Sequence, residues 1–199
     1  MRGMHGMLTK ALLPATLALL LAGCVSLTPD PPASLLTLTP VRTAPAGATA
    51  AGDAASALAV IVPETDQRLN VVRVPVQTSD SSLAYLKDAV WVEKPARLFQ
   101  QLLAETIRAG GSRLVVGEGD FGYAAATKLS GRLLDMGFDA SSGSVVVRFD
   151  AVLQTPDGKV KTQRFENRVP GVAPDAASVG PALNQAANAV AGEVADWVR

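Results

Sequence analysis

Few residues of this chain have side chains that suit covalent or metal chemistry. The 199 residues include one cysteine, Cys24, and one histidine, His5. A single cysteine cannot form an internal disulfide, and a single thiol is a poor metal site. Because Cys24 lies in the stretch LLLAGCVS at residues 19–26, its place along the chain is more informative than its reactivity.

Two carboxylate pairs have a spacing that acid–base chemistry could use. They are Glu64 with Asp66 and Asp135 with Asp139. Catalysis needs a carboxyl group whose surroundings tune its pKa, whereas acids at such short separations in turns are usually solvated. We therefore predict no catalytic residue, no metal and no cofactor. An oxygen-only calcium site stays open, although the sequence contains no EF-hand loop.

Residues 117–122 (GEGDFG) match the glycine spacing of dinucleotide-binding loops. Two acids in this stretch, Glu118 and Asp120, would repel a pyrophosphate. The segment that follows is predicted to be a strand, so no helix N-terminus would face the phosphates. We interpret the stretch as a glycine turn between strands. The net charge of zero gives no reason to expect nucleic-acid binding.

The first 23 residues have the plan of a secretory signal peptide. A positive start with Arg2, His5 and Lys10 precedes an apolar run at residues 11–22 and a small-residue site. The alternative is a membrane-spanning helix, but the run is shorter than the ~20 residues that cross a bilayer, and Pro14 interrupts it. The translation start is left open among three methionines: Met1, Met4 and Met7.

The residues Leu21, Ala22, Gly23 and Cys24 resemble the lipobox of bacterial lipoproteins. The resemblance implies that a signal peptidase recognises the first three and cleaves before Cys24, whose sulfur and new amino group then carry acyl chains such as palmitate. More than one chain makes membrane attachment effectively permanent. The alternative is a core cysteine that follows small residues by chance. Val25 replaces the Asp typical of inner-membrane retention, which favours the periplasmic face of the outer membrane.

Beyond the signal, the chain divides into a tether and a domain. Residues 24–34 are rich in proline and serine and are predicted to form a lipidated, extended tether. Residues 35–199 are predicted to form one domain, in which the Ala-, Gly- and Pro-rich segment 40–57 is predicted to be a flexible loop. The mature chain would lack histidine and a free thiol, which excludes Ser–His and Cys–His nucleophile pairs and most transition-metal sites.

Alternating hydrophobic residues predict a set of strands in the domain. Residues 145–153 alternate with a period of two, and the turn 155–158 (TPDG) joins them to a more polar edge strand at 160–169. With residues 127–138 these segments form a predicted antiparallel meander. Residues 83–91 fit a strand or a helix, and we predict a strand. Further short strands are predicted at 35–38, 58–62, 70–77 and 113–116.

Two segments have the spacing of amphipathic helices. Pro95 begins the first, which ends at Gly110. The second begins near Asp175 or Ser178, both good N-caps, and its small apolar stripe suggests close packing on a sheet. The predicted fold is α/β (α+β), a single domain with a mixed, mainly antiparallel sheet and two amphipathic helices on one face.

Tyr85 and Trp91 lie in one segment of a chain that is poor in aromatic residues. Aromatic side chains near a surface often anchor an interface, so both are candidate partner contacts. The alternative is core packing, which we favour for Trp91.

The order of these features resembles the ABC-type transport auxiliary lipoprotein family, which includes paraquat-inducible protein C. The resemblance covers roughly residues 35–198. It rests on the following stretches: LLTLTP (35–40), ALAVIVP (57–63), LNVVRVPVQ (69–77), LAYLKDAVWVEKPARLFQQLLAETI (83–107) and AANAVAGEVADWV (186–198).

The resemblance implies a fold similar to the TolB N-terminal domain and a non-enzymatic role in lipid transport across the envelope. Its partners would be an ABC transporter complex and an MCE-domain protein that carries lipid between the two membranes. Some members form rings, so the resemblance also implies a homo-oligomer. The alternative is a structural or assembly lipoprotein of another envelope complex.

The lipobox interpretation predicts the behaviour of a Cys24→Ala variant. Without the thiol the chain should accumulate as an unprocessed precursor and lose lipid-mediated membrane attachment, while the domain stays folded. Metabolic labelling with palmitate, gel mobility and membrane fractionation would measure this. A processed, membrane-bound Ala variant would contradict the interpretation.

Overall fold

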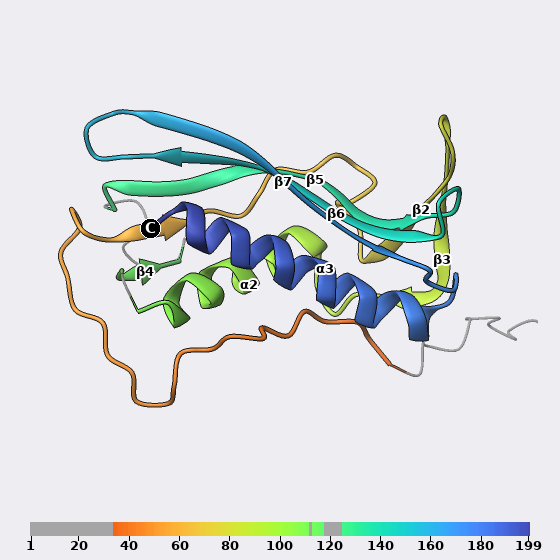
Figure 1. The fold of residues 1–199 in the computed structure, drawn as a ribbon, viewed down its shortest axis with the longest axis horizontal. Helices are drawn as coiled ribbons and strands as arrows, with labels where there is room; N and C mark the ends of the chain where they lie inside the picture. Colours follow the sequence, from red (N-terminus) through yellow and green to blue (C-terminus); the bar gives the residue numbers. More distant parts are fainter. Residues whose placement is uncertain (1–33, 112, 118–124) are drawn as a thin grey trace, which may run out of the picture. The chain divides into compact units, whose positions relative to one another are not determined.

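The computed structural model describes residues 34–111, 113–117 and 125–199. Within these residues the chain forms one mixed sheet and two helices (Figure 1), which confirms the predicted α/β (α+β) class. The strands are β1 (Leu58–Val60), β2 (Arg73–Ser79), β3 (Ser82–Val90), β4 (Val115–Val116), β5 (Thr127–Asp139), β6 (Ser144–Gln154) and β7 (Val160–Pro170), and the helices are α2 (Pro95–Ala109) and α3 (Ala176–Trp197).

The sheet is organised around β5. β5, β6 and β7 form the predicted antiparallel meander. On its other edge β5 pairs in parallel with β1 near its start, where Leu58 is opposite Thr127, and with β2 near its end, where Val76 is opposite Phe138. β4 extends the sheet beyond β1, and β3 extends it beyond β2. Among the described residues β7 pairs only with β6, so it is the predicted edge strand.

The period-two pattern of β6 places one of its sides in the core. The buried members are all apolar: Val145, Val147, Phe149, Ala151 and Leu153. The alternate residues from Arg148 to Val152 are half-buried on the other side. The turn after β6 has Gly158 at a φ of 79°, a conformation that glycine adopts without steric cost. The turn therefore fixes how β6 and β7 align.

Both helices begin as their sequences predict. α2 starts at Pro95, where the missing N–H removes no hydrogen bond, and its chain leaves the helix at Gly110. Asp175 is the N-cap of α3, and its side chain accepts a hydrogen bond of 2.8 Å from the backbone N–H of Ser178. The two candidate start residues therefore act together as one cap.

The two helices cover the same face of the sheet (Figure 1). α3 packs on β6 and β7, and α2 packs on α3 and near β1 and β4. Phe99 of α2 meets Phe149 of β6 edge-to-face with ring centroids 5.3 Å apart. The apolar stripe of α3 is core, as predicted: Val179, Leu183, Ala186, Val190 and Val194 are fully buried, and Trp197 is partly buried.

Four predicted strands differ from the structure. The strand predicted at 58–62 ends at Val60, and the one predicted at 113–116 is limited to Val115–Val116. Residues 35–38 form a single bridge, Leu36 with Trp91, instead of a strand. The next residues cannot continue that pairing because the backbone N–H groups of Thr39 and Val41 donate to the side chains of Asn184 and Asn188 on α3. The strand predicted at 70–77 begins only at Arg73, after bends over the preceding residues.

The segment predicted as a flexible loop, residues 40–57, contains no helix or strand. Its start is nevertheless held against both helices. Val41 N–H donates to Asn188 of α3, and Ala44 N–H donates to Glu105 of α2, both at 2.8 Å. Its end is held too, because Ala54 accepts a hydrogen bond of 2.8 Å from the N–H of Ala126. The mobility of the segment between these contacts stays a prediction.

Gly131 of β5 should tolerate no side chain. Its φ is 149°, and a Cβ there would lie 2.0 Å from the carbonyl oxygen of Asp150 on β6. We expect Gly131→Ala to lower the free energy of unfolding by about 2 kcal/mol or more, because the clash involves backbone on both sides. Urea unfolding would measure it. Gly117→Ala is the control, since no atom of the described residues lies within 4 Å of its added Cβ. Equal losses for both variants would contradict the argument.

Candidate functional site

The residues predicted to be recognised and lipidated, Leu21, Ala22, Gly23 and Cys24, lie outside the described residues. Residues 118–122 of the glycine turn predicted at 117–122 lie outside them as well. Lipidation therefore stays a prediction. The described chain begins at Ser34, ten residues beyond Cys24, so the structure shows where the tether joins the domain.

The structure separates the two aromatic candidates. The side chain of Trp91 is 2% exposed and belongs to the core, which agrees with the packing interpretation and leaves it unavailable to a partner. Its indole Nε1 is buried and has no hydrogen-bond partner among the described residues, so packing positions the ring. Tyr85 is only partly buried, and the guanidinium of Arg73 lies 4.4 Å from its ring centroid. Only Tyr85 stays a candidate contact.

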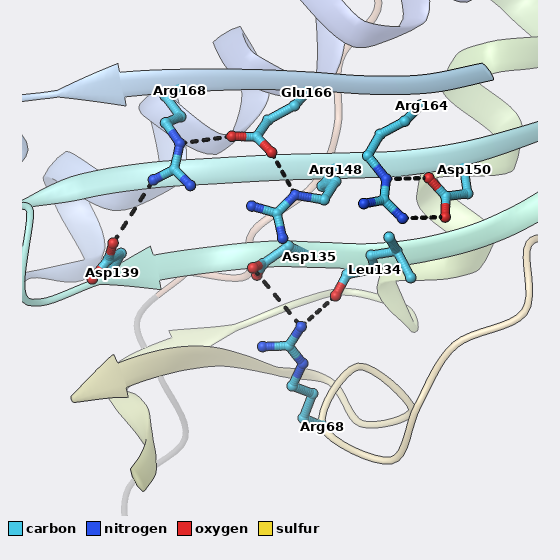
Figure 2. A network of polar contacts seen from close by, with 9 residues as sticks. All are labelled: Arg68, Leu134, Asp135, Asp139, Arg148, Asp150, Arg164, Glu166 and Arg168. Carbon is cyan, nitrogen blue, oxygen red and sulfur yellow. Dashed lines mark hydrogen bonds and ion pairs between the residues drawn. The ribbon is translucent and has the colours of Figure 1, made fainter. Parts of the chain in front are cut away.

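The sheet face away from the helices carries a ladder of ion pairs (Figure 2). Arg164 binds Asp150 through two hydrogen bonds of 2.6 and 2.7 Å. The Arg148 guanidinium donates to Glu166, which also accepts from Arg168. We call these five residues the arginine ladder. Each of its carboxylates has an arginine partner, so the ladder cross-links β6 and β7.

Strand register produces the arginine ladder. Arg148 lies opposite Glu166, and Asp150 lies opposite Arg164, in the antiparallel pairing of β6 with β7. Opposite charges directly across a strand pair stabilise it. Sequence reasoning missed the ladder, although its signal was present in the sequence. The predicted turn at 155–158 already fixes which residues of the two strands face each other.

The two carboxylate pairs considered from the sequence do not come together as acid–base sites. Asp66 binds Arg68 at 3.1 Å, and the pKa of Asp139 is lowered by hydrogen bonds from Ser141 and Ser142. Burial raises the pKa of Asp135, and Arg68 at 3.8 Å partly offsets this. The cavity beside Asp135 has a volume of about 10 Å³, room for one water molecule and no substrate.

A larger cavity, of about 610 Å³, lies between residues 44–56 and the end of α2. Small apolar side chains dominate its wall, and its two cations are Arg108 and Arg113. Arg108 is already held by Glu105 at 2.5 Å. The described lining therefore offers space but no paired groups that could act on a substrate.

No cluster of three or more His, Cys, Asp or Glu side chains in residues 34–111, 113–117 and 125–199 has a geometry suited to a metal ion. No helix in the same residues is long and apolar enough to cross a membrane.

Comparison with known proteins identifies the family of the chain and supports its fold. A family model described as "ABC-type transport auxiliary lipoprotein component" matches residues 36–195. The chain is similar in fold to a Xanthomonas campestris protein assigned to DUF330, with a TM-score of 0.69 and 18% identity over 83% of this chain and 94% of that one. A crystal structure titled as an uncharacterised protein has a TM-score of 0.62 and 13% identity over 83% and 100%. No curated protein matches the chain.

Glu166 connects two arginines of the ladder, so its charge should contribute to stability. The hydrogen bond from Arg148 lowers the pKa of Glu166 below its ordinary 4.5. The stabilisation is therefore present above pH 4.5 and is lost as the pH falls through the lowered pKa. We expect Glu166→Gln to lower the free energy of unfolding by about 1 kcal/mol at neutral pH.

Urea unfolding of both proteins across a pH series would test this expectation. The difference between them should shrink as the pH falls below 4.5. Lys87→Gln is the control, because its side chain is 92% exposed and should contribute nothing measurable. A difference that is the same at neutral and acid pH would show that charge is not its cause.

Proposed function

Because the chain belongs to the family of ABC-type transport auxiliary lipoprotein components, whose model matches residues 36–195, we propose that it is a lipid-anchored, non-enzymatic docking component of an ABC/MCE-type lipid transport system. Its anchor is Cys24, and its place is the periplasmic face of the outer membrane. Its partners are an ABC transporter complex and an MCE-domain protein. The family match is the observation that carries this proposal.

Four features of the chain support the lipoprotein part of the proposal. The apolar run at 11–22 and the lipobox Leu21–Cys24 precede the matched region. The tether between Cys24 and Ser34 spans up to about 35 Å when extended, which is enough to join an anchored cysteine to the folded domain. Val25 follows the cysteine in place of a retention Asp, which supports the outer membrane as the destination.

The chemistry of the described surface supports a docking role more than a catalytic one. The acids of the sheet face are engaged by arginines, and the cavity beside Asp135, the one acid of the described residues whose pKa is raised, has room for a single water only. Arginine is enriched in protein interfaces because its guanidinium forms several directed hydrogen bonds. The exposed face of β5, β6 and β7 is therefore a surface on which a protein partner could form specific polar contacts.

Co-purification tests the proposed partners. We expect tagged full-length protein, extracted from membranes in mild detergent, to recover an ATPase, a permease and an MCE-domain protein together. The Cys24→Ala variant is the matched control: it has the same domain without the anchor, and should lose these proteins. Consistent recovery of a different envelope complex, with no MCE-domain protein, would favour a structural or assembly lipoprotein instead.

A further inference from the structure

Three chain segments meet where the tether joins the domain. The N–H of Leu36 donates to the carbonyl of Val90 at 2.7 Å, and the carbonyl of Leu36 accepts from the N–H of Val92 at 2.8 Å. The N–H of Trp91 donates to the carbonyl of Val72 at 2.8 Å. The residues around Leu36, Trp91 and Val72 therefore lie side by side as a short three-stranded ribbon.

The two sides of this ribbon differ. Trp91 is 2% exposed, and Leu36 lies against α3 at Gly180, so both side chains point inward. Side chains alternate along extended chain, so Leu35 and Val92 point outward. They are 51% and 55% exposed. We call the apolar surface formed by these two side chains the entry face.

Cations and an aromatic ring border the entry face. Arg73 lies opposite Val90 in the β2–β3 pairing and stacks over Tyr85. Lys94 donates to the side-chain amide of Asn70 at 2.9 Å. Neither of these contacts neutralises the cation. The nearest acid in sequence, Glu93, is paired with Arg97 at 3.3 Å. The border of the entry face is therefore positive.

We propose that the entry face lies on the membrane surface, with Leu35 and Val92 among the lipid headgroups and Arg73 and Lys94 against anionic phosphates. Apolar side chains bordered by cations and a tyrosine match the boundary between lipid headgroups and acyl chains. This inference rests on the proposed lipidation of Cys24. It adds a defined orientation of the domain to that anchor.

The tether supports a membrane as the occupant. Leu35 is eleven residues from Cys24, so the entry face is at most about 40 Å from the lipid even when the chain is fully extended. A domain of this size is itself roughly 30–40 Å across. A short linker also gives an effective concentration on the order of millimolar. A surface with weak intrinsic affinity for lipid would therefore be bound for much of the time.

A single added cysteine can report this contact. Cys24 is the only natural cysteine, and acylation removes its thiol, so a cysteine at position 92 would be the sole free thiol of the lipidated protein. We would label full-length Val92→Cys with nitrobenzoxadiazole and reconstitute it in vesicles of phosphatidylethanolamine and phosphatidylglycerol. The entry-face proposal predicts blue-shifted emission and several-fold stronger quenching by nitroxide-labelled lipid than at a control site.

Val160→Cys is the matched control. Val160 is 60% exposed, close to the value for Val92, and the β6–β7 turn that precedes it lies at the end of the sheet away from β3 (Figure 1). Replacing Arg73 and Lys94 together with Gln should reduce quenching at position 92. Exchanging phosphatidylglycerol for phosphatidylcholine should have the same effect, because both changes remove the charge attraction.

The outcomes separate the two proposals. Protein that does not float with the vesicles would overturn the lipid anchor itself. Protein that floats but shows equal quenching at positions 92 and 160 would overturn the entry face as a membrane contact. A blue shift at position 92 that nitroxide lipid does not quench would also overturn it, and would assign the face to a protein surface or a second copy.

Discussion

The domain depends on β5 being hydrogen bonded along both of its edges. β6 covers one edge over its whole length, whereas three successive pieces of chain cover the other: β1, residues 61–64 and β2. In the middle piece the N–H groups of Ile61 and Glu64 donate to carbonyls of β5 at 2.9 Å. Glycines allow this close approach, since a Cβ on Gly137 would lie 2.5 Å from the carbonyl oxygen of Pro75. A long central strand thus joins segments that are distant in sequence.

The placement of β5 determines where the remaining elements can pack. β6 and β7 follow it through tight turns, and their inward residues make the surface that α3 covers. α3 in turn holds the start of the domain, because Asn184 and Asn188 bind the backbone of Thr39 and Val41 as a neighbouring strand would. The first and last parts of the described chain are therefore one packed unit.

Sequence patterns predicted the elements that depend on local periodicity and failed where distant contacts decide. The meander and the stripe of α3 follow from spacing alone, because their apolar residues recur with the period of the strand or helix. The end of the predicted strand at 35–38 depends on Asn188, about 150 residues away, and no local pattern contains that partner. The arginine ladder lies between these cases. Its pairs follow from the predicted turn at 155–158, but only after the register of β6 against β7 has been derived from that turn.

The rigidity of the junction between the tether and the domain also matters for function. A lipid anchor on a freely swinging tether would localise the domain without orienting it. Here Leu36, just after the tether, donates its N–H to Val90 of β3 and accepts from the N–H of Val92, and its side chain is wedged against α3 at Gly180. Orientation imposed near Leu36 is therefore transmitted to the sheet as a whole, including the exposed arginine ladder. For a protein proposed to act through location and contact, this rigid junction is what would allow a membrane anchor to present a chosen face to a partner.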